Sequence, residues 1–425
     1  MKKNFQPTLA LAILIAASHP SPAQEWTRFR GPNGTGISDA KTIPTKFTEA
    51  DFNWKTVLPG TGHSSPVLWG DKIFLTSADE NGEKFFVLCL NAADGKIIWQ
   101  KESPLKPHKK HGRYNTLASS TPAVDAERVY ICRTEAEHQV LLAFDHQGEK
   151  KWERDLGPFA GMHGAGMSPI VYEGKVVLSN EQEAESFLIA LDAKSGELKW
   201  KTPRQTGDNE TTYSTPCVFQ PNGAAPTLIF NSENHGISAV APDTGKVVWE
   251  FPGAFDKRSV SSPVLAGDLI IGSCGSGGGG NFVVAIRPGD AKGKKPEKAY
   301  EVRRSAPYVP TSVCVGDWLY LWSDAGVVSR VHAATGEINW QERAGGNFFS
   351  SPVCVDGRIF NVSTTGEVVV IPVSEKFEVL ARNPLGETMH STPAVSGGRM
   401  YFHTLKHLIS VGGKKAAEKV ATPAS

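Results

Sequence analysis

Short apolar runs alternate with polar turns along most of the chain. One unit contains the runs Lys72–Leu75 and Phe86–Leu90, and a later unit repeats them as Lys175–Leu178 and Phe187–Leu191. Each run is bounded by Gly, Asp or Asn residues, which is typical of a short β-strand between tight turns. No window of about 11 residues shows the period of an amphipathic helix. The pattern therefore predicts an all-β protein.

A small polar pair, followed by a proline and a small apolar residue, recurs along the chain. The seven clear copies are Ser64-Ser65-Pro66-Val67, Ser120-Thr121-Pro122-Ala123, Met167-Ser168-Pro169-Ile170, Ser214-Thr215-Pro216-Cys217, Ser261-Ser262-Pro263-Val264, Ser350-Ser351-Pro352-Val353 and Ser391-Thr392-Pro393-Ala394. In an eighth copy, Pro310-Thr311-Ser312-Val313, Ser312 takes the place of the proline. The intervals are 56, 47, 47, 47, 49, 40 and 41 residues. Seven such intervals predict eight units of one repeat.

A second motif follows the same spacing and consists of a turn ending in glycine and a tryptophan four residues later. The clear pairs are Gly95 with Trp99, Gly148 with Trp152, Gly196 with Trp200, Gly245 with Trp249 and Gly336 with Trp340, while Tyr300 and Leu380 replace the tryptophan in two weaker units. Glycine suits this position because a tight hairpin often requires a positive φ. We expect each aromatic side chain to pack against the next unit, where it buries a large apolar area.

Four antiparallel strands in a repeat of roughly 40–50 residues describe the blade of a β-propeller. The last unit has three strands, at 392–395, 400–404 and 408–411, whereas a spare strand containing Trp54 lies at 52–57. We expect this strand to complete blade eight, because closure removes two exposed sheet edges. An open solenoid, the alternative, has no use for a spare strand. The sequence predicts an eight-bladed β-propeller of four-stranded antiparallel blades over residues 52–412, closed by an N-terminal strand.

The first 23 residues have the pattern of an export signal. Two lysines precede the nine apolar residues Leu9–Ala17, a run too short to span a bilayer, and Ser21-Pro22-Ala23 supplies small residues before a cleavage site. A buried N-terminal helix is the alternative, but Pro20 follows the apolar run closely. We expect cleavage after Ala23, a periplasmic or secreted location, an N-terminal extension over 24–51 and a flexible tail over 413–425.

Other membrane attachments are not expected. No cysteine stands at the expected mature N-terminus, so a lipid anchor is not predicted, and no later apolar stretch reaches the ~20 residues of a transmembrane helix. The six cysteines stand singly and form no CxxC motif, which argues against a zinc ribbon or a redox pair. We interpret them as buried free thiols, with disulfides as the alternative in an oxidising compartment.

Composition and charge narrow the classes of function. Of 425 residues, 40% are hydrophobic and 21% charged, which is an ordinary globular composition. The 45 Lys and Arg residues nearly balance 44 Asp and Glu residues, giving a formal net charge of +1. This balance argues against a broad nucleic-acid interface, which requires a basic footprint.

The Gly-x-x-x-Trp hairpins and Ser-x-Pro strands resemble the pyrroloquinoline-quinone (PQQ) repeat, the blade unit of the quinoprotein alcohol dehydrogenase-like propellers. The resemblance covers residues 52 to 412, nearly all of the expected mature chain. That superfamily contains eight-bladed enzymes that carry PQQ and a metal, and also the noncatalytic outer-membrane assembly propeller BamB. The segment Trp26–Gly34 is similar to the opening W-x-x-F-R-G-P of exported bacterial PQQ-like repeat proteins.

Candidate binding residues cluster on the loops that lead into the innermost strands. In a four-stranded meander these loops emerge on one face, near the axis, and form what we call the loop face. A funnel lined by His, Arg and Tyr there is suited to a ligand or a peptide, and a solvated loop surface is the alternative. The candidates are His63, Arg113, Tyr114, His163, Glu210, Tyr213, Arg258, Tyr308 and His390.

The resemblance implies two alternative functions. We expect a noncatalytic scaffold of the bacterial envelope, a monomer without a cofactor, that binds a protein or polymer through one propeller face. The alternative is a PQQ- and calcium-dependent dehydrogenase of alcohols or sugars.

The dehydrogenase requires cationic and aromatic groups around the quinone and Glu, Asn or Asp oxygens around the ion. Charge could come from Arg113, Lys257 and Arg258, and oxygens from Asn180 with Glu181 or from Glu233 with Asn234. The chain lacks the adjacent cysteine pair and the long insertions of the family's alcohol dehydrogenases, and we predict no catalytic residue.

Overall fold

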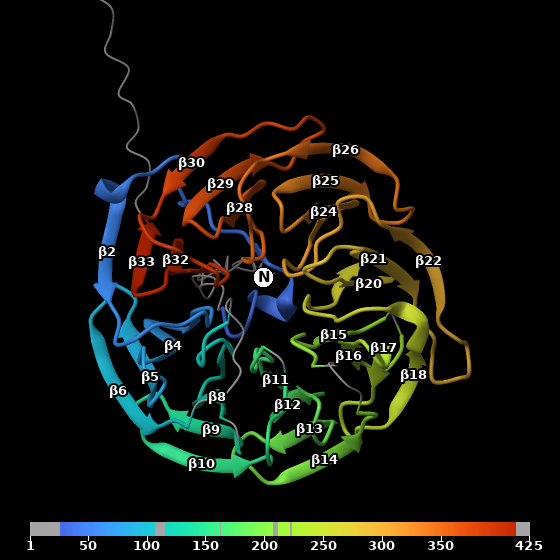
Figure 1. The fold of residues 1–425 in the computed structure, drawn as a ribbon, viewed down its shortest axis with the longest axis horizontal. Helices are drawn as coiled ribbons and strands as arrows, with labels where there is room; N and C mark the ends of the chain where they lie inside the picture. Colours follow the sequence, from blue (N-terminus) through green and yellow to red (C-terminus); the bar gives the residue numbers. More distant parts are fainter. Residues whose placement is uncertain are drawn as a thin grey trace, which may run out of the picture.

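The structure is a computed structural model that describes residues 26–106, 115–135, 137–161, 163–206, 211–221 and 223–413. Eight sheets surround a central axis, seven of four strands and one of five (Figure 1). The predicted eight-bladed propeller is therefore confirmed. The expected signal segment and most of the expected tail lie outside the described residues.

The first four blades follow one another in chain order. Blade one contains β3 (Val67–Trp69), β4 (Lys72–Ala78), β5 (Lys84–Asn91) and β6 (Ile97–Pro104). Blade two contains β7 (Ala123–Val124), β8 (Arg128–Thr134), β9 (Gln139–Asp145) and β10 (Lys150–Asp155). Blade three contains β11 (Ile170–Tyr172), β12 (Lys175–Asn180), β13 (Phe187–Asp192) and β14 (Leu198–Pro203). Blade four contains β15 (Cys217–Phe219), β16 (Thr227–Ser232), β17 (Gly236–Val240) and β18 (Val247–Phe251).

The second half continues the series and joins the N-terminal segment. Blade five contains β19 (Val264–Ala266), β20 (Leu269–Cys274), β21 (Phe282–Arg287) and β22 (Glu297–Val302), and blade six β23 (Val313–Val315), β24 (Trp318–Trp322), β25 (Val327–His332) and β26 (Ile338–Arg343). Blade seven contains β27 (Val353–Val355), β28 (Arg358–Val362), β29 (Glu367–Pro372), β30 (Ala381–Pro384) and the added β1 (Ile37–Ser38). Blade eight contains β31 (Ala394–Ser396), β32 (Arg399–His403), β33 (His407–Gly412) and β2 (Phe52–Val57). The described helical elements are the 3₁₀ turns η1 (Pro32–Gly34), η2 (Glu49–Asp51) and η3 (Pro252–Ala254).

Blade eight is built from both ends of the described chain. Strand β2 pairs antiparallel with β33, so that Thr56 lies opposite Leu408 and Val57 opposite His407. In Figure 1 the blue β2 lies beside the red β33 at the rim of the ring. The predicted closure by an N-terminal strand is confirmed.

Each hairpin glycine receives the aromatic ring of the preceding blade. The five glycines of the clear pairs have φ between 69° and 85°, and a Cβ on any of them would lie 2.4–2.8 Å from an atom of that ring. The indole N–H then donates to the next blade, as Trp152 does to the carbonyl of Ala193 at 3.0 Å. The expectation that the aromatic residue packs against the next unit is confirmed, and the glycine is needed both for its φ and for the space.

The hydroxyl residue before each proline connects neighbouring blades. The backbone N–H of Thr121 donates to the Ser168 hydroxyl at 2.9 Å, and the N–H of Thr392 donates to the Ser65 hydroxyl at 2.9 Å, which joins blade eight to blade one. Seven such bonds follow the ring, and the described residues lack only the one between Ser168 and Thr215. The repeated Ser/Thr is therefore an interblade acceptor close to the axis.

Residues 26–51, which we call the axial strap, cross the centre of the ring, a path that the sequence did not predict. Turn η1 lies at the centre of the view in Figure 1. Strand β1 pairs in parallel with the innermost strand of blade seven, Ile37 opposite Cys354. The Asn33 side chain both donates to and accepts from the backbone of Val218 in blade four, at 2.8 Å each. The strap thus ties together inner strands on opposite sides of the ring.

Two arginines of the strap are buried beside the axis. Arg30 is fully buried and donates to the carbonyls of Thr311 and of Ser312, the latter at 2.8 Å. Arg28 is 7% exposed, and its Nη2 donates to the carbonyl of Pro216. Burial lowers the pKa to about 9 for Arg30 and about 10 for Arg28, so both guanidinium groups are charged at neutral pH.

The six cysteines are all free and are buried or half-buried, which agrees with their interpretation as thiols. Within the described residues, no helix has the length and apolar character needed to cross a bilayer.

Candidate functional site

Six of the nine candidate residues lie in the described part of the chain, and they form two groups on the loop face. Arg113, Tyr114 and Glu210 lie outside the described residues. His163, Tyr213, Arg258 and Tyr308 form one group, the tyrosine–arginine cluster, whereas His63 and His390 belong to a second, the histidine cluster. The six described candidates thus form two groups of different chemistry within the funnel expected from the sequence. Their role as ligand-binding residues stays a prediction.

The tyrosine–arginine cluster takes one side chain from each loop that leads into blades three to six. Arg258 donates from Nη1 to the Tyr308 hydroxyl at 3.4 Å. Burial and the nearby Arg258 charge lower the pKa of His163, so this imidazole is neutral at pH 7. The cluster therefore carries its positive charge on the guanidinium group.

The two tyrosines of this cluster are held in different ways. The carboxylate of Asp324 accepts the N–H of Tyr308 at 2.7 Å and that of Val309 at 3.1 Å, which fixes the loop carrying Tyr308. Burial raises the pKa of Tyr213 to about 12, so its hydroxyl stays protonated. That hydroxyl is buried, and it donates to no acceptor among the described residues.

The histidine cluster lies where blades eight and one meet. The rings of His63 and His390 are 4.4 Å apart between centroids, and Phe349 packs edge-on against His390 at 5.0 Å. Behind them His403 is fully buried and donates from Nδ1 to the carbonyl of Ser64 at 2.6 Å. Burial, with the neighbouring imidazoles, lowers the pKa of His63 to about 3. His63 is therefore uncharged at neutral pH, and its ring lies beside the aromatic rings of His390 and Phe349.

Glu181, a candidate calcium ligand in the sequence, is used for an ion pair within blade three. Its Oε1 accepts from Arg204 Nε at 2.9 Å, and its Oε2 accepts from the Ser179 hydroxyl at 2.9 Å. The same guanidinium group donates to Glu250 of blade four at 2.8 Å. The Arg204 and Glu181 side chains are only 2% and 3% exposed. Both carboxylate oxygens of Glu181 are therefore bonded within blade three, and Arg204 in turn links this blade to blade four.

His235 completes this network in one tautomer. Its Nε2 accepts the backbone N–H of Gln205 at 3.0 Å, so the proton lies on Nδ1, which donates to Glu250 at 3.2 Å. Burial opposes the ionisation of Glu250, but the bonds from His235 and Arg204 outweigh it and lower the pKa of this carboxyl to about 2. Glu250 is thus a stabilising anion at neutral pH.

The variant Glu250→Gln should be less stable than the wild type by about 2 kcal/mol at pH 7, because a charged acceptor of buried donors is lost. The folded-state pKa of about 2 lies below the ordinary value of 4.5, so this contribution is complete above pH 4.5 and is lost as the pH falls towards 2. Urea unfolding at several pH values measures the gap between the two proteins. Glu197→Gln, at an exposed turn, is the matched control. A gap that does not change between pH 7 and pH 3 would contradict the assignment.

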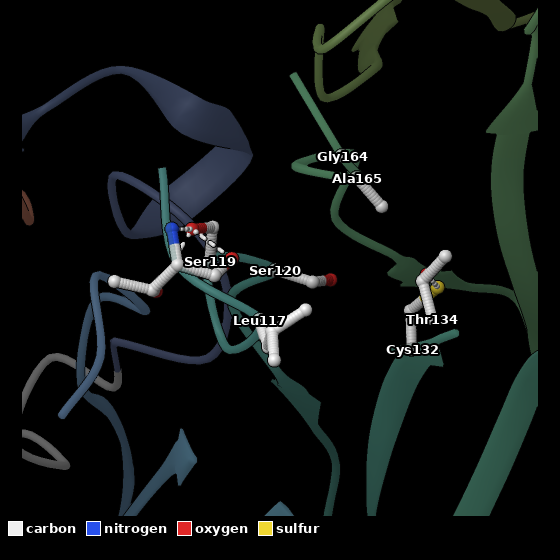
Figure 2. Close-up of a pocket in the computed structure, with 8 residues that line it drawn as sticks. Leu117, Ser119, Ser120, Cys132, Thr134, Gly164 and Ala165 are labelled. Carbon is white, nitrogen blue, oxygen red and sulfur yellow. Dashed lines mark hydrogen bonds between the residues drawn. The ribbon is translucent and has the colours of Figure 1, made fainter. Parts of the chain in front are cut away.

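A small hollow opens beside these clusters, between blades two and three (Figure 2). Figure 2 shows Ser120 facing Cys132 and Thr134 across the hollow, with Gly164 and Ala165 along one side. Its enclosed volume is about 10 Å³, which is room for about one water molecule. A tricyclic cofactor such as PQQ does not fit in it.

The described residues also offer no metal centre of the usual composition. No group of three or more His, Cys, Asp or Glu residues among them is arranged to hold a metal ion. Asn180, the other oxygen donor expected beside Glu181, donates to the carbonyl of Glu185 at 3.4 Å and accepts from Gln182 at 3.4 Å. Lys257, a proposed cationic partner, donates to the carbonyls of Gly279 and Gly280. Sequence alone could not reveal these competing partners, because each depends on the folded loop.

The blade motif, the ring closure and the loop face together define an eight-bladed propeller of PQQ-like repeats. The family model described as "Outer membrane protein assembly factor BamB" matches residues 83–342 and 301–376, and the chain belongs to this family.

Known relatives include both scaffolds and enzymes. The chain is 24% identical over 194 residues to the outer membrane protein assembly factor BamB of Yersinia pestis, covering 44% of this chain and 43% of that protein. It is 27% identical over 210 residues to a polyvinylalcohol dehydrogenase of a Pseudomonas species, covering 44% of this chain and 30% of the enzyme. The matched regions thus span less than half of either relative.

The structure of a europium-containing methanol dehydrogenase is similar to this chain, with a TM-score of 0.65 and 14% identity over 90% of this chain and 89% of the enzyme. At this identity the likeness shows the fold alone.

Proposed function

We propose that this protein is a noncatalytic binding scaffold of the bacterial envelope, similar in class to BamB, which presents its loop face to a protein or polymer partner. The observation that carries the proposal is the tyrosine–arginine cluster, in which four consecutive loops supply an arginine, two tyrosines and a histidine. Tyrosine and arginine are enriched among the residues that dominate binding energy at protein interfaces. The rigid ring holds these residues in one arrangement before a partner arrives, which lowers the entropy cost of association.

The two clusters divide the chemistry of recognition between them. Arg258 supplies positive charge and hydrogen-bond donors, whereas His63, His390 and Phe349 offer aromatic surface, with His63 uncharged at neutral pH. A partner segment that carries an acidic group next to an apolar side chain matches this arrangement. The names of the family and of the Yersinia relative support an envelope role, and the export signal expected over residues 1–23 belongs to the same proposal.

Several groups that a PQQ- and calcium-dependent dehydrogenase would require are bonded to other parts of the chain, which supports the scaffold over that alternative. In one of the two expected pairs of oxygen donors, Asn180 and Glu181 are bonded to other groups, and Lys257 donates to the carbonyls of Gly279 and Gly280. A calcium ion at Glu181 would have to displace the buried Arg204 from this carboxylate, which is unfavourable. The dehydrogenase relatives therefore share the propeller fold with this chain, and we propose no quinone chemistry for this protein.

Site-specific photo-crosslinking tests the binding face. A benzoylphenylalanine at position 308 should give a discrete crosslinked species when the mature protein is irradiated in cells that express it. The same probe at position 197, an exposed turn of a blade hairpin, is the control and should give none. Equal labelling at the two positions, or none at position 308, would contradict a binding role for the loop face.

Calorimetry separates the scaffold from the enzyme. Titration of the mature protein with PQQ and Ca²⁺ should give no binding heat above that of dilution. Binding at micromolar affinity or tighter would overturn the proposal in favour of a quinoprotein.

A further inference from the structure

Arg28 is a buried cation with no anionic partner among the described residues. Its side chain comes from the axial strap, the residue is 7% exposed, and no carboxylate oxygen of the described residues lies within 4.0 Å of it. Within the same part of the chain, its hydrogen bonding is limited to Nη2, which donates to the carbonyl of Pro216, whereas the buried Nε has no acceptor. A buried charge that lacks both a counter-ion and a full set of hydrogen bonds is costly, and proteins rarely retain one.

Arg30, two residues along the same strap, provides an internal comparison. It is also buried and also lacks a carboxylate among the described residues, but each of its three guanidinium nitrogens donates to a backbone carbonyl, from Gly34, Thr35, Thr311 and Ser312. The strap therefore can satisfy a buried arginine completely with carbonyl oxygens. Arg28 and Arg30 are both buried, but Arg28 has fewer hydrogen-bond acceptors than Arg30.

The described surroundings of Arg28 offer further donors but no negative charge. Burial raises the pKa of the adjacent Cys217 thiol to about 12, so this group is neutral. Thr215, which precedes the Pro216 that Arg28 contacts, lies at the one described break in the interblade ring of hydroxyl bonds. On the strap side the packing is close, because a Cβ on Gly34 would lie 3.3 Å from Arg28 Nη2.

We propose that Arg28 holds a small monovalent anion of the chloride class beside the axis of the ring, next to blade four. The anion takes the place of the missing carboxylate and accepts hydrogen bonds from the guanidinium group, which are strong when the donor is charged. Because Nη2 already lies against Gly34 and donates to Pro216, we place the ion beside Nε, whose N–H has no acceptor. This site is independent of the loop-face function, because it involves the strap instead of the loop clusters.

Bromide crystallography tests the site directly on the wild-type protein. Crystals grown with sodium bromide in place of chloride should show an anomalous peak within about 3.5 Å of the Arg28 guanidinium group. An ordered water with no anomalous signal would overturn the proposal. This measurement requires no variant, so it is decisive even where substitutions at position 28 fail to fold.

Thermal unfolding at constant ionic strength tests the same site in solution. The wild type should unfold about 3 °C higher in sodium chloride than in sodium gluconate, because an ion that binds only the folded state stabilises it. Arg28→Met should lose this difference. Arg303→Met, which removes a guanidinium that is 58% exposed, should retain it. A bromide peak without any chloride effect in solution would be an adventitious ion only and would also overturn the proposal.

Discussion

A disulfide should form between positions 57 and 407 in the double variant Val57→Cys/His407→Cys, and it should stabilise the protein by about 4 kcal/mol. The two residues are directly paired across β2 and β33. Opposite residues of an antiparallel pair have Cα atoms about 4.5–5.5 Å apart, which is within the range of a disulfide. The bond would enclose most of the polypeptide in one loop, so it would remove a large part of the entropy of the unfolded chain. Urea unfolding with and without reductant measures the gain.

The controls for this experiment separate closure from accidental oxidation. Each single cysteine variant should show no gain, and the comparison with His407→Cys alone accounts for the lost contact between His407 and Glu387. Val57→Cys combined with Leu198→Cys places two exposed rim cysteines in different blades and should form no bond. Failure of the 57–407 pair to link, with both cysteines accessible, would contradict the shared sheet.

The variant Gly196→Ala should lose about 3–4 kcal/mol of unfolding free energy. Gly196 has a φ of 73°, and a Cβ there would lie 2.7 Å from the buried ring of Trp152 in the preceding blade. The backbone conformation costs an alanine about 1 kcal/mol, and the clash with the indole adds the larger part. Urea unfolding of the purified variant measures this loss.

Gly174→Ala is the matched control for this prediction. Gly174 lies in another hairpin of blade three with a φ of 69°, but a Cβ at this position would have no atom within 4 Å of it. It should therefore lose only about 1 kcal/mol, through the backbone alone. Equal losses at the two positions would mean that the aromatic contact between blades contributes nothing to stability.

The ring could be predicted from the sequence because its determinants are local and repeated. The glycine at each turn and the hydroxyl before each proline act within one blade or between neighbours, so eight copies define the same geometry eight times. The closure could be predicted from the number of strands, because the strand that contains Trp54 supplies the fourth strand that the last unit lacks. His63 and His390 meet for the same reason, because closure brings the first and last loops together.

The axial strap and the ionic partners could not be predicted in the same way. Residues 26–51 have no strand periodicity, and their path depends on inner strands of several blades that exist only in the assembled ring. Glu181 was a reasonable metal ligand by residue type, but its partner Arg204 lies 23 positions away and reaches it only across a folded blade. Such long-range polar contacts leave no local signal in a single sequence.

The central position of the strap has a consequence for the order of folding. Arg30, made early in synthesis, finds its acceptors Thr311 and Ser312 only after 281 and 282 further residues have been added. Until then the first segment of the chain must stay hydrated, because an arginine cannot leave water before its acceptors are in place. Contacts of such long sequence separation slow folding. The propeller can therefore be completed only after translation has delivered its last blades.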